Sequence, residues 1–100
     1  MTRVRTTSSR GNVFRDLGFP EPEAENLRIR SELMMHVTKT IRRRGWTQSE
    51  AAKCMRVTQP RISDLVRGKF DKFSADTLIE MLGRAGVEVT ITTRQRRRVA

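Results

Sequence analysis

Reactive and aromatic residues are scarce in this chain of 100 residues, which has one cysteine, one histidine, one tryptophan and no tyrosine. Cys54 alone cannot form an internal disulfide, and Cys54 with His36 is too little for a zinc site. Paired carboxylates and a phosphate-binding loop are also missing, so the sequence indicates no enzyme, no catalytic residue, no metal and no cofactor. RNA binding through a stacking sheet of aromatic residues is equally poorly supported.

Long apolar runs are missing as well. No segment could span a bilayer and no apolar signal segment follows Met1, so we expect no membrane contact and a cytoplasmic protein. Hydrophobic residues make up 36% of the chain, which limits the core that one small domain can bury. A second copy of the chain that covers more apolar surface would therefore add stability.

Positive charge is what the chain has in excess. Lys and Arg number 21 against 11 Asp and Glu, which gives a formal net charge of +10 and a pI near 11.5. This excess indicates a polyanionic partner, and nucleic acid before a membrane surface. The alternative, a basic protein whose charge serves only its solubility, stays open from composition alone.

The most informative stretch is 47–68, which predicts two short helices joined by a tight turn. Thr47 is a good N-cap, and Glu50 three residues later can complete a capping box. Small and apolar residues then follow at helical spacing. The first helix is therefore expected to end near Met55.

The second helix of this stretch has its own start signals. Arg56-Val57-Thr58 is expected to form the turn, with Thr58 as N-cap and Pro60 in the first turn, where a missing amide hydrogen costs nothing. Helical spacing places three residues on its inner face: Ile62, Leu65 and Val66. The other side chains of the helix are left for solvent or a ligand.

Two further helices are expected beside this stretch. One should run from Glu23 to about Arg44, where Gly45 stops it, and carry an apolar stripe that packs beneath the two short helices. Another should start after Ser74 as N-cap and continue to Gly86. The predicted fold class is all-α, a compact bundle of four to five helices with a short C-terminal β-strand.

The N-terminal part divides into two segments. Residues 1–10 are basic, rich in Ser and Thr and without apolar periodicity, so we expect a disordered tail. Residues 11–22 instead carry apolar side chains, including Phe14 and Phe19, among glycines and prolines that break any long helix. Such a segment must dock somewhere. Two alternatives are open: it folds back on its own domain, or it contacts a partner protein.

The C-terminal part switches from helical to alternating periodicity. Val87, Val89 and Ile91 share one side of a predicted strand within 87–93. A lone strand cannot satisfy its backbone groups inside an all-helical domain. We therefore expect it to pair with the same strand of a second copy, which would make a homodimer, or with a strand of another protein. The domain would span 11–93, and 94–100 would be a basic tail.

Two capped helices in this register, with a polar outer face, make a helix-turn-helix, whose second helix lies in the major groove of double-stranded DNA. The alternative is an ordinary helical hairpin. Because their side chains match base edges, the residues expected to read bases are Gln59, Arg61, Ser63 and Asp64. The residues expected to hold phosphate, which fixes position without reading sequence, are Thr47, Gln48, Thr58, Arg67, Lys69 and Lys72.

This stretch closely resembles the XRE family of phage-repressor-like DNA-binding domains. The shared features are the Thr-Gln opening at Thr47, the Val57-Thr58-Gln59 run, the Pro60-Arg61-Ile62-Ser63 run, and Leu65 followed by Arg67-Gly68-Lys69. One departure is Arg56, which stands where the family usually places glycine, at a turn position that often needs positive φ.

The order of segments over 11–92 is similar to small XRE antitoxins of the HigA type. That resemblance implies a dimer that represses its own operon and neutralises a RelE/HigB-like ribonuclease toxin. No residue identifies a toxin. Two alternatives therefore stay open: an orphan XRE-type regulator without a toxin, and an inhibitor of a partner protein that binds DNA only secondarily.

Overall fold

The computed structural model describes residues 2–6 and 13–95, which form five α-helices, a short 3₁₀ helix and two strands. In chain order the elements are β1 (Thr2–Thr6), α1 (Val13–Asp16), α2 (Glu21–Arg44), α3 (Gln48–Met55), α4 (Gln59–Val66), η1 (Phe70–Lys72), α5 (Ala75–Arg84) and β2 (Val87–Ile91). The predicted class, a mostly helical bundle with a C-terminal strand, is confirmed. None of the described helices is long and apolar enough to cross a membrane.

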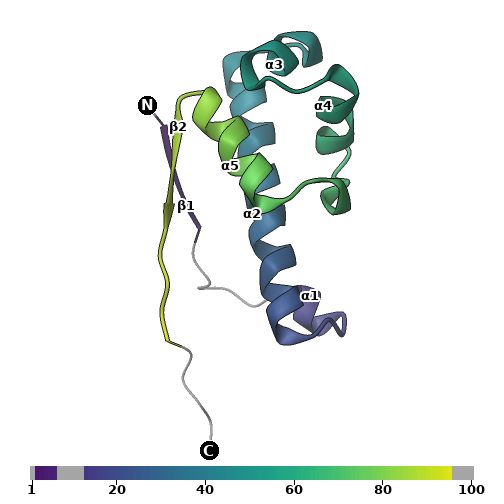
Figure 1. Ribbon diagram of the computed structural model, residues 1–100, viewed down its shortest axis with the longest axis vertical. Coiled ribbons are helices and arrows are strands. Elements are labelled where there is room, and N and C mark those ends of the chain that lie inside the picture. The colour runs from purple at the N-terminus through teal and green to yellow at the C-terminus, as the bar shows by residue number, and fades with distance from the viewer. Residues whose placement is uncertain (1, 7–12, 96–100) are drawn as a thin grey trace, which may run out of the picture.

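Helix α2 is the axis of the domain and runs through its whole length (Figure 1). It ends as expected at Gly45, whose φ of 66° is left-handed, and whose N–H donates to the Arg42 carbonyl at 3.1 Å. The next amide, of Trp46, donates to the Ile41 carbonyl at 3.1 Å. These two bonds satisfy carbonyls that the helix end leaves without partners, and Gly45 takes the left-handed geometry without a Cβ clash.

The core lies between α2, the two short helices of the motif and α5. Helix α2 contributes a buried stripe that includes Leu33 and Val37, and α5 closes the core from the other side with Leu78 and Leu82. Met55 at the end of α3 is also fully buried. The side chains that make this core are the ones the apolar spacing selects, so the helices are held mainly by burial of one face each.

Strands β1 and β2 lie side by side and pair in parallel (Figure 1), with Val4 opposite Val89 and Arg3 opposite Glu88. The prediction of a disordered tail is therefore wrong for residues 2–6. Residues 1 and 7–10 of that predicted tail lie outside the described residues, as do 96–100 of the C-terminal tail. The prediction failed because residues 2–6 have almost no apolar alternation; what they supply to β2 is backbone N–H and C=O groups, which any sequence carries.

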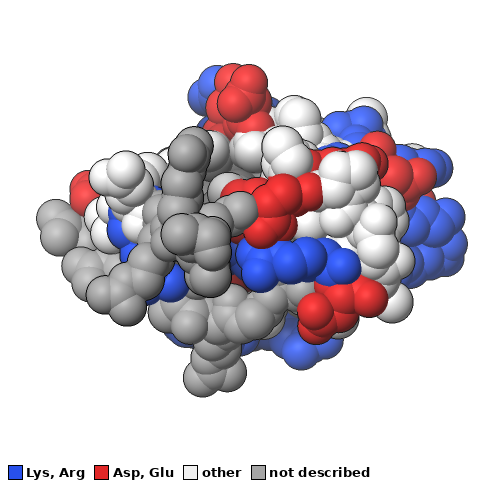
Figure 2. Space-filling model, turned by 90° about the horizontal axis from the view of Figure 1, so that it is seen from below, with Lys and Arg blue, Asp and Glu red and all other residues white. Residues whose placement is uncertain are grey.

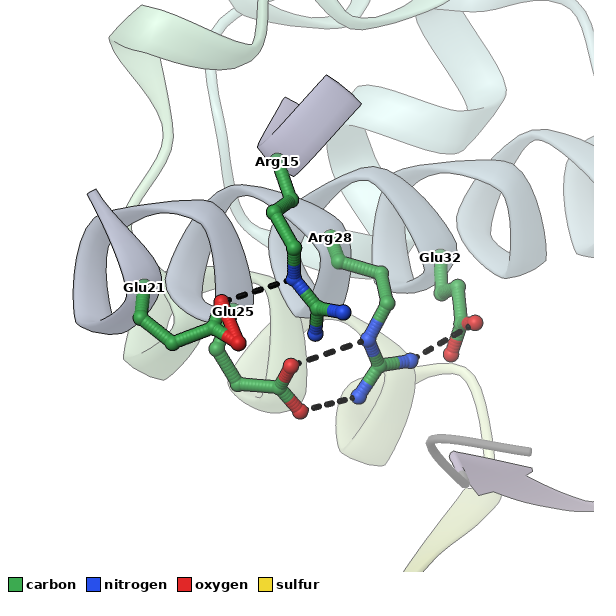
Figure 3. A network of polar contacts seen from close by, with 5 residues as sticks. All are labelled: Arg15, Glu21, Glu25, Arg28 and Glu32. Atoms are coloured by element: carbon green, nitrogen blue, oxygen red, sulfur yellow. Dashed lines mark hydrogen bonds and ion pairs between the residues drawn. The ribbon is translucent and has the colours of Figure 1, made fainter. Parts of the chain in front are cut away.

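Helix α1 folds back onto the start of α2. The Phe14 ring packs edge-on against Phe19 at 6.1 Å and against Phe70 of η1 at 5.6 Å between centroids. Nε of Arg15 donates to Glu21 at 2.8 Å, which ties α1 to the first turn of α2 (Figure 3). Phe14 therefore folds back on its own domain, which is one of the two alternatives that the sequence leaves open.

Farther along α2, Figure 3 shows one guanidinium between two carboxylates. Arg28 donates from Nη2 to Glu25 at 2.7 Å and from Nη1 to Glu32 at 2.9 Å, at the i−3 and i+4 positions of the same helix. The hydrogen bond to Glu25 raises the pKa of Arg28. Pairs at this spacing support the helix, here with a single cation shared between two anions.

Candidate nucleic-acid interface

The capping box predicted at the start of α3 is present. The Glu50 amide donates to the Thr47 hydroxyl at 3.1 Å, and the Thr47 amide donates to the Glu50 carboxylate at 2.8 Å. The bond from the Thr47 amide holds the pKa of Glu50 below its ordinary value. The Thr47 oxygen accepts in the box, so its own hydrogen is still free to be donated to a phosphate.

The turn between α3 and α4 has left-handed geometry at Arg56, with φ 59° and ψ 45°. The expectation of a positive φ at this position is confirmed, although the residue is not glycine. A side chain with a Cβ in this region costs roughly 1–2 kcal/mol relative to the right-handed one. The turn is fixed from the core side, because Nη1 of Arg84 donates to the Met55 carbonyl at 3.0 Å.

Helix α4 is anchored by two side chains. Ile62 and Leu65 are 0% and 2% exposed, and burying each contributes roughly 1.5–3 kcal/mol relative to leaving it in water. Val66, which the sequence placed on the same inner face, is 41% exposed, so that assignment is wrong. Successive residues are turned by about 100°, so Val66 lies beyond Ile62 on the side away from Leu65, and this short helix buries only a narrow stripe.

The start of α4 differs from the start of α3. Thr58 has the extended backbone of an N-cap, and its carbonyl accepts from the Arg61 and Ile62 amides at 3.1 and 3.2 Å. Thr58 is therefore the N-cap residue that the sequence predicts, but its hydroxyl makes no capping hydrogen bond. Pro60 explains part of this, since an early proline removes one of the amides that a cap would serve.

Two of the predicted base-reading residues are engaged within the protein. The guanidinium carbon of Arg61 lies 4.7 Å from the centroid of the buried Phe73 ring, a cation–π contact. Asp64 lies between two lysines, with carboxylate oxygens 3.6 Å from Nζ of Lys69 and 3.5 Å from Nζ of Lys72. Burial raises the pKa of Asp64, but the two ammonium groups outweigh it and hold that pKa below its ordinary value.

The loop that carries these lysines is held from α2. Nη1 of Arg30 donates to the carbonyl of Phe70, the first residue of η1, at 3.2 Å and to that of Phe73, just after η1, at 3.4 Å. Sequence reasoning missed both this contact and the one from Arg84 to Met55. A lone arginine that reaches a distant carbonyl leaves no periodic signal in a sequence, and no residue pattern here would have found it.

The remaining predicted residues keep unused polar groups, and all of them are exposed except Ser63, which is half-buried. Within the described part of the chain, no hydrogen bond or ion pair to the side chains of Gln59, Ser63 and Arg67 is found, and the same is true of Gln48 at the start of α3. Gln59 and Ser63 are one turn apart on α4, and Arg67 is one turn farther. We call Gln48, Thr58, Gln59, Ser63 and Arg67 the outer face of the motif. No group of three or more potential metal-ligand side chains gathers in the described ranges.

Comparison with known proteins agrees with this geometry. The family model described as "Helix-turn-helix domain" matches residues 13–94. A solved structure described provisionally as an XRE family transcriptional regulator is 28% identical with a TM-score of 0.71, over 79% of this chain and 92% of that one. No curated protein matches. With a family match over most of its length, and with α3 and α4 arranged around the predicted turn, the chain belongs to the helix-turn-helix domain family.

Proposed function

We propose that the protein is a sequence-specific DNA-binding transcriptional regulator whose helix α4 enters the major groove. The observation that carries this is the contrast within α4, which is locked to the core by Ile62 and Leu65 while its Gln59 and Ser63 keep their polar groups unused. A rigid helix with unpaired amide and hydroxyl groups is what reading base edges requires. The likeness to an XRE regulator supports the same conclusion.

Roles within the outer face follow from side-chain chemistry. Gln59 offers a donor and an acceptor together, which suits adenine, and Ser63 one turn later reaches the next base pair. Thr58, Gln48 and Arg67 flank them and hold phosphates, which sets the position of α4 without reading sequence. Arg61 could read a base only after leaving the Phe73 ring. Asp64 could read a base only after leaving Lys69 and Lys72.

The experiment is a titration of the protein against the DNA upstream of its own gene and against a scrambled duplex, at two salt concentrations. Gln59→Ala is expected to lose about 1–3 kcal/mol on the upstream DNA and little on the scrambled one. Gln48→Ala is the matched control, the same substitution at the first position of α3. It should weaken binding to both duplexes equally. Equal wild-type affinity for the two duplexes would overturn the proposal.

The regulator is a homodimer that uses β2. In the described residues the sheet contains only β1 and β2, and sheets this small are marginal by themselves. An antiparallel β2 of a second copy, centred on Val89, would set Ile91 opposite Val87 of that copy. Ile91 is 59% exposed, so it gains cover from such pairing. Two chains per DNA site in the same titration would support the dimer.

A second candidate function is binding of a partner protein, the toxin that the resemblance to HigA-type antitoxins suggests. It is favoured by α1 and the loop after it, where Val13 and Leu17 are 60% and 71% exposed. Acidic, basic and uncharged side chains are interspersed at this end of the molecule (Figure 2), which does not suit a phosphate backbone. Co-expression with the product of the neighbouring gene tests it: Leu17→Asp should abolish a complex that Gln59→Ala leaves intact.

A further inference from the structure

Arg56 is the one residue other than glycine with a positive φ among those the structure describes. Glycine would adopt this turn without strain, so the arginine carries a local cost that glycine would avoid. Residues in strained backbone conformations cluster at functional sites.

One structural role open to a cation at this position is already filled by another residue. A basic side chain near a helix C-terminus can bind the last carbonyls of the helix. Here that position is occupied by Arg84, whose Nη1 donates to the carbonyl of Met55 at 3.0 Å. The backbone of the turn is closed by the Arg56 and Val57 amides, which both donate to the Ala52 carbonyl. None of these bonds uses the Arg56 guanidinium.

The side chain of Arg56 is exposed and makes no hydrogen bond or ion pair with any part of the chain that the structure describes. It lies two residues before Thr58 and three before Gln59, at the N-terminal end of α4. If that end enters a groove, the residues just before it lie at the groove edge, where the phosphates run. Arg56 thus precedes the outer-face residues Thr58 and Gln59 in the segment that leads into α4.

We propose that the Arg56 guanidinium binds a DNA phosphate at the edge of the groove that α4 enters. The inference rests on the proposed function and adds one contact to it. A guanidinium presents several N–H donors that match the oxygens of a phosphate, and it is charged at every relevant pH. Since phosphates are alike along any duplex, this contact contributes affinity and position but no sequence preference.

The test uses three variants of the full chain, Arg56→Gly, Arg56→Asn and Arg56→Lys, on the upstream duplex and on the scrambled duplex. Arg56→Gly is expected to unfold at the same or a higher denaturant concentration than the wild type, because the left-handed strain is gone. Its affinity should nevertheless fall several-fold on both duplexes, with a log–log salt slope smaller by about 0.9. Arg56→Asn tolerates the left-handed geometry without charge and should match the Gly variant on DNA, whereas Arg56→Lys should keep the slope.

Lys39→Gln is the control for net charge, since it removes one exposed positive charge from α2, outside the motif. It should leave the slope unchanged. The inference is overturned if Arg56→Gly binds either duplex with the wild-type slope, or if Lys39→Gln lowers the slope as much. The proposed function fails by a different result, namely that the wild type does not prefer the upstream duplex. In that case the salt slopes measured on the scrambled duplex still decide the role of Arg56. A wild type that binds neither duplex overturns both.

Discussion

Helices α3 and α4 start with the same residue type in the same backbone conformation, yet the two threonines are used differently. Thr47 has φ −71° and ψ 167°, and Thr58 has φ −75° and ψ 156°. The hydroxyl of Thr47 is bound within a capping box, whereas that of Thr58 caps nothing. One helix start is thus completed by the protein itself, and the other keeps its polar groups free. This is the difference expected between a supporting helix and the helix that, in our proposal, enters the major groove.

The largest expected effect tests whether α4 is as firmly anchored as this comparison requires. Ile62→Ala removes a fully buried side chain and should lower the free energy of unfolding by about 2–5 kcal/mol. Val66→Ala, on the same helix but 41% exposed, should change it by less than about 0.5 kcal/mol. Chemical denaturation followed by circular dichroism measures both. Similar losses from the two variants would mean that α4 is not held by the narrow stripe described above.

A smaller effect tests the two threonines directly. Thr47→Ala breaks the capping box and should cost about 1 kcal/mol of unfolding free energy. Thr58→Ala loses no capping bond, so its cost should stay below about 0.5 kcal/mol, and its main effect should be weaker binding to any duplex. Denaturation and DNA titration of the same two samples give the answer. Equal destabilisation by both substitutions would mean that the Thr58 hydroxyl stabilises α4 as much as the Thr47 hydroxyl stabilises α3.

The smallest effect concerns Asp64, which engages Lys69 and Lys72 in the free protein. Asp64→Asn releases both lysines and should raise affinity for scrambled DNA by about two- to fivefold, as expected for ion pairs near the surface whose lysines are exposed. Asp71→Asn removes the same charge from η1, where Asp71 has no ion pair within the described residues. If the two variants gain the same affinity for scrambled DNA, net charge alone explains the gain and Asp64 does not restrain the lysines.

The sequence predicts well what depends on near neighbours in the chain. The Thr47 capping box, the stop at Gly45 and the positive φ of Arg56 are each set by residues a few positions apart, and all three are confirmed. Burial of Ile62 and Leu65 followed from helical spacing in the same way. Local geometry and periodicity are encoded in short windows, so a single sequence is enough to find them.

What the sequence did not predict depends on residues that meet only in the folded chain. The contact of Arg61 with Phe73 and the bonds from Arg30 to η1 join separate elements. The first contact means that the Arg61 side chain is not free to bind a ligand. The bonds from Arg30 fix the loop that carries Lys69 and Lys72. The pairing of 2–6 with β2 was missed for a related reason, because it is made by backbone groups that no side-chain pattern reports.

The parallel pairing of β1 and β2 also imposes an order on folding. β1 precedes every helix of the domain and β2 follows them all, so a nascent chain must emerge as far as β2 before the pair can form. Contacts between such distant segments carry the largest loop-closure cost and form slowly. The helices can pack around α2 before then. β1 is synthesised ahead of them, yet it reaches its final position after them.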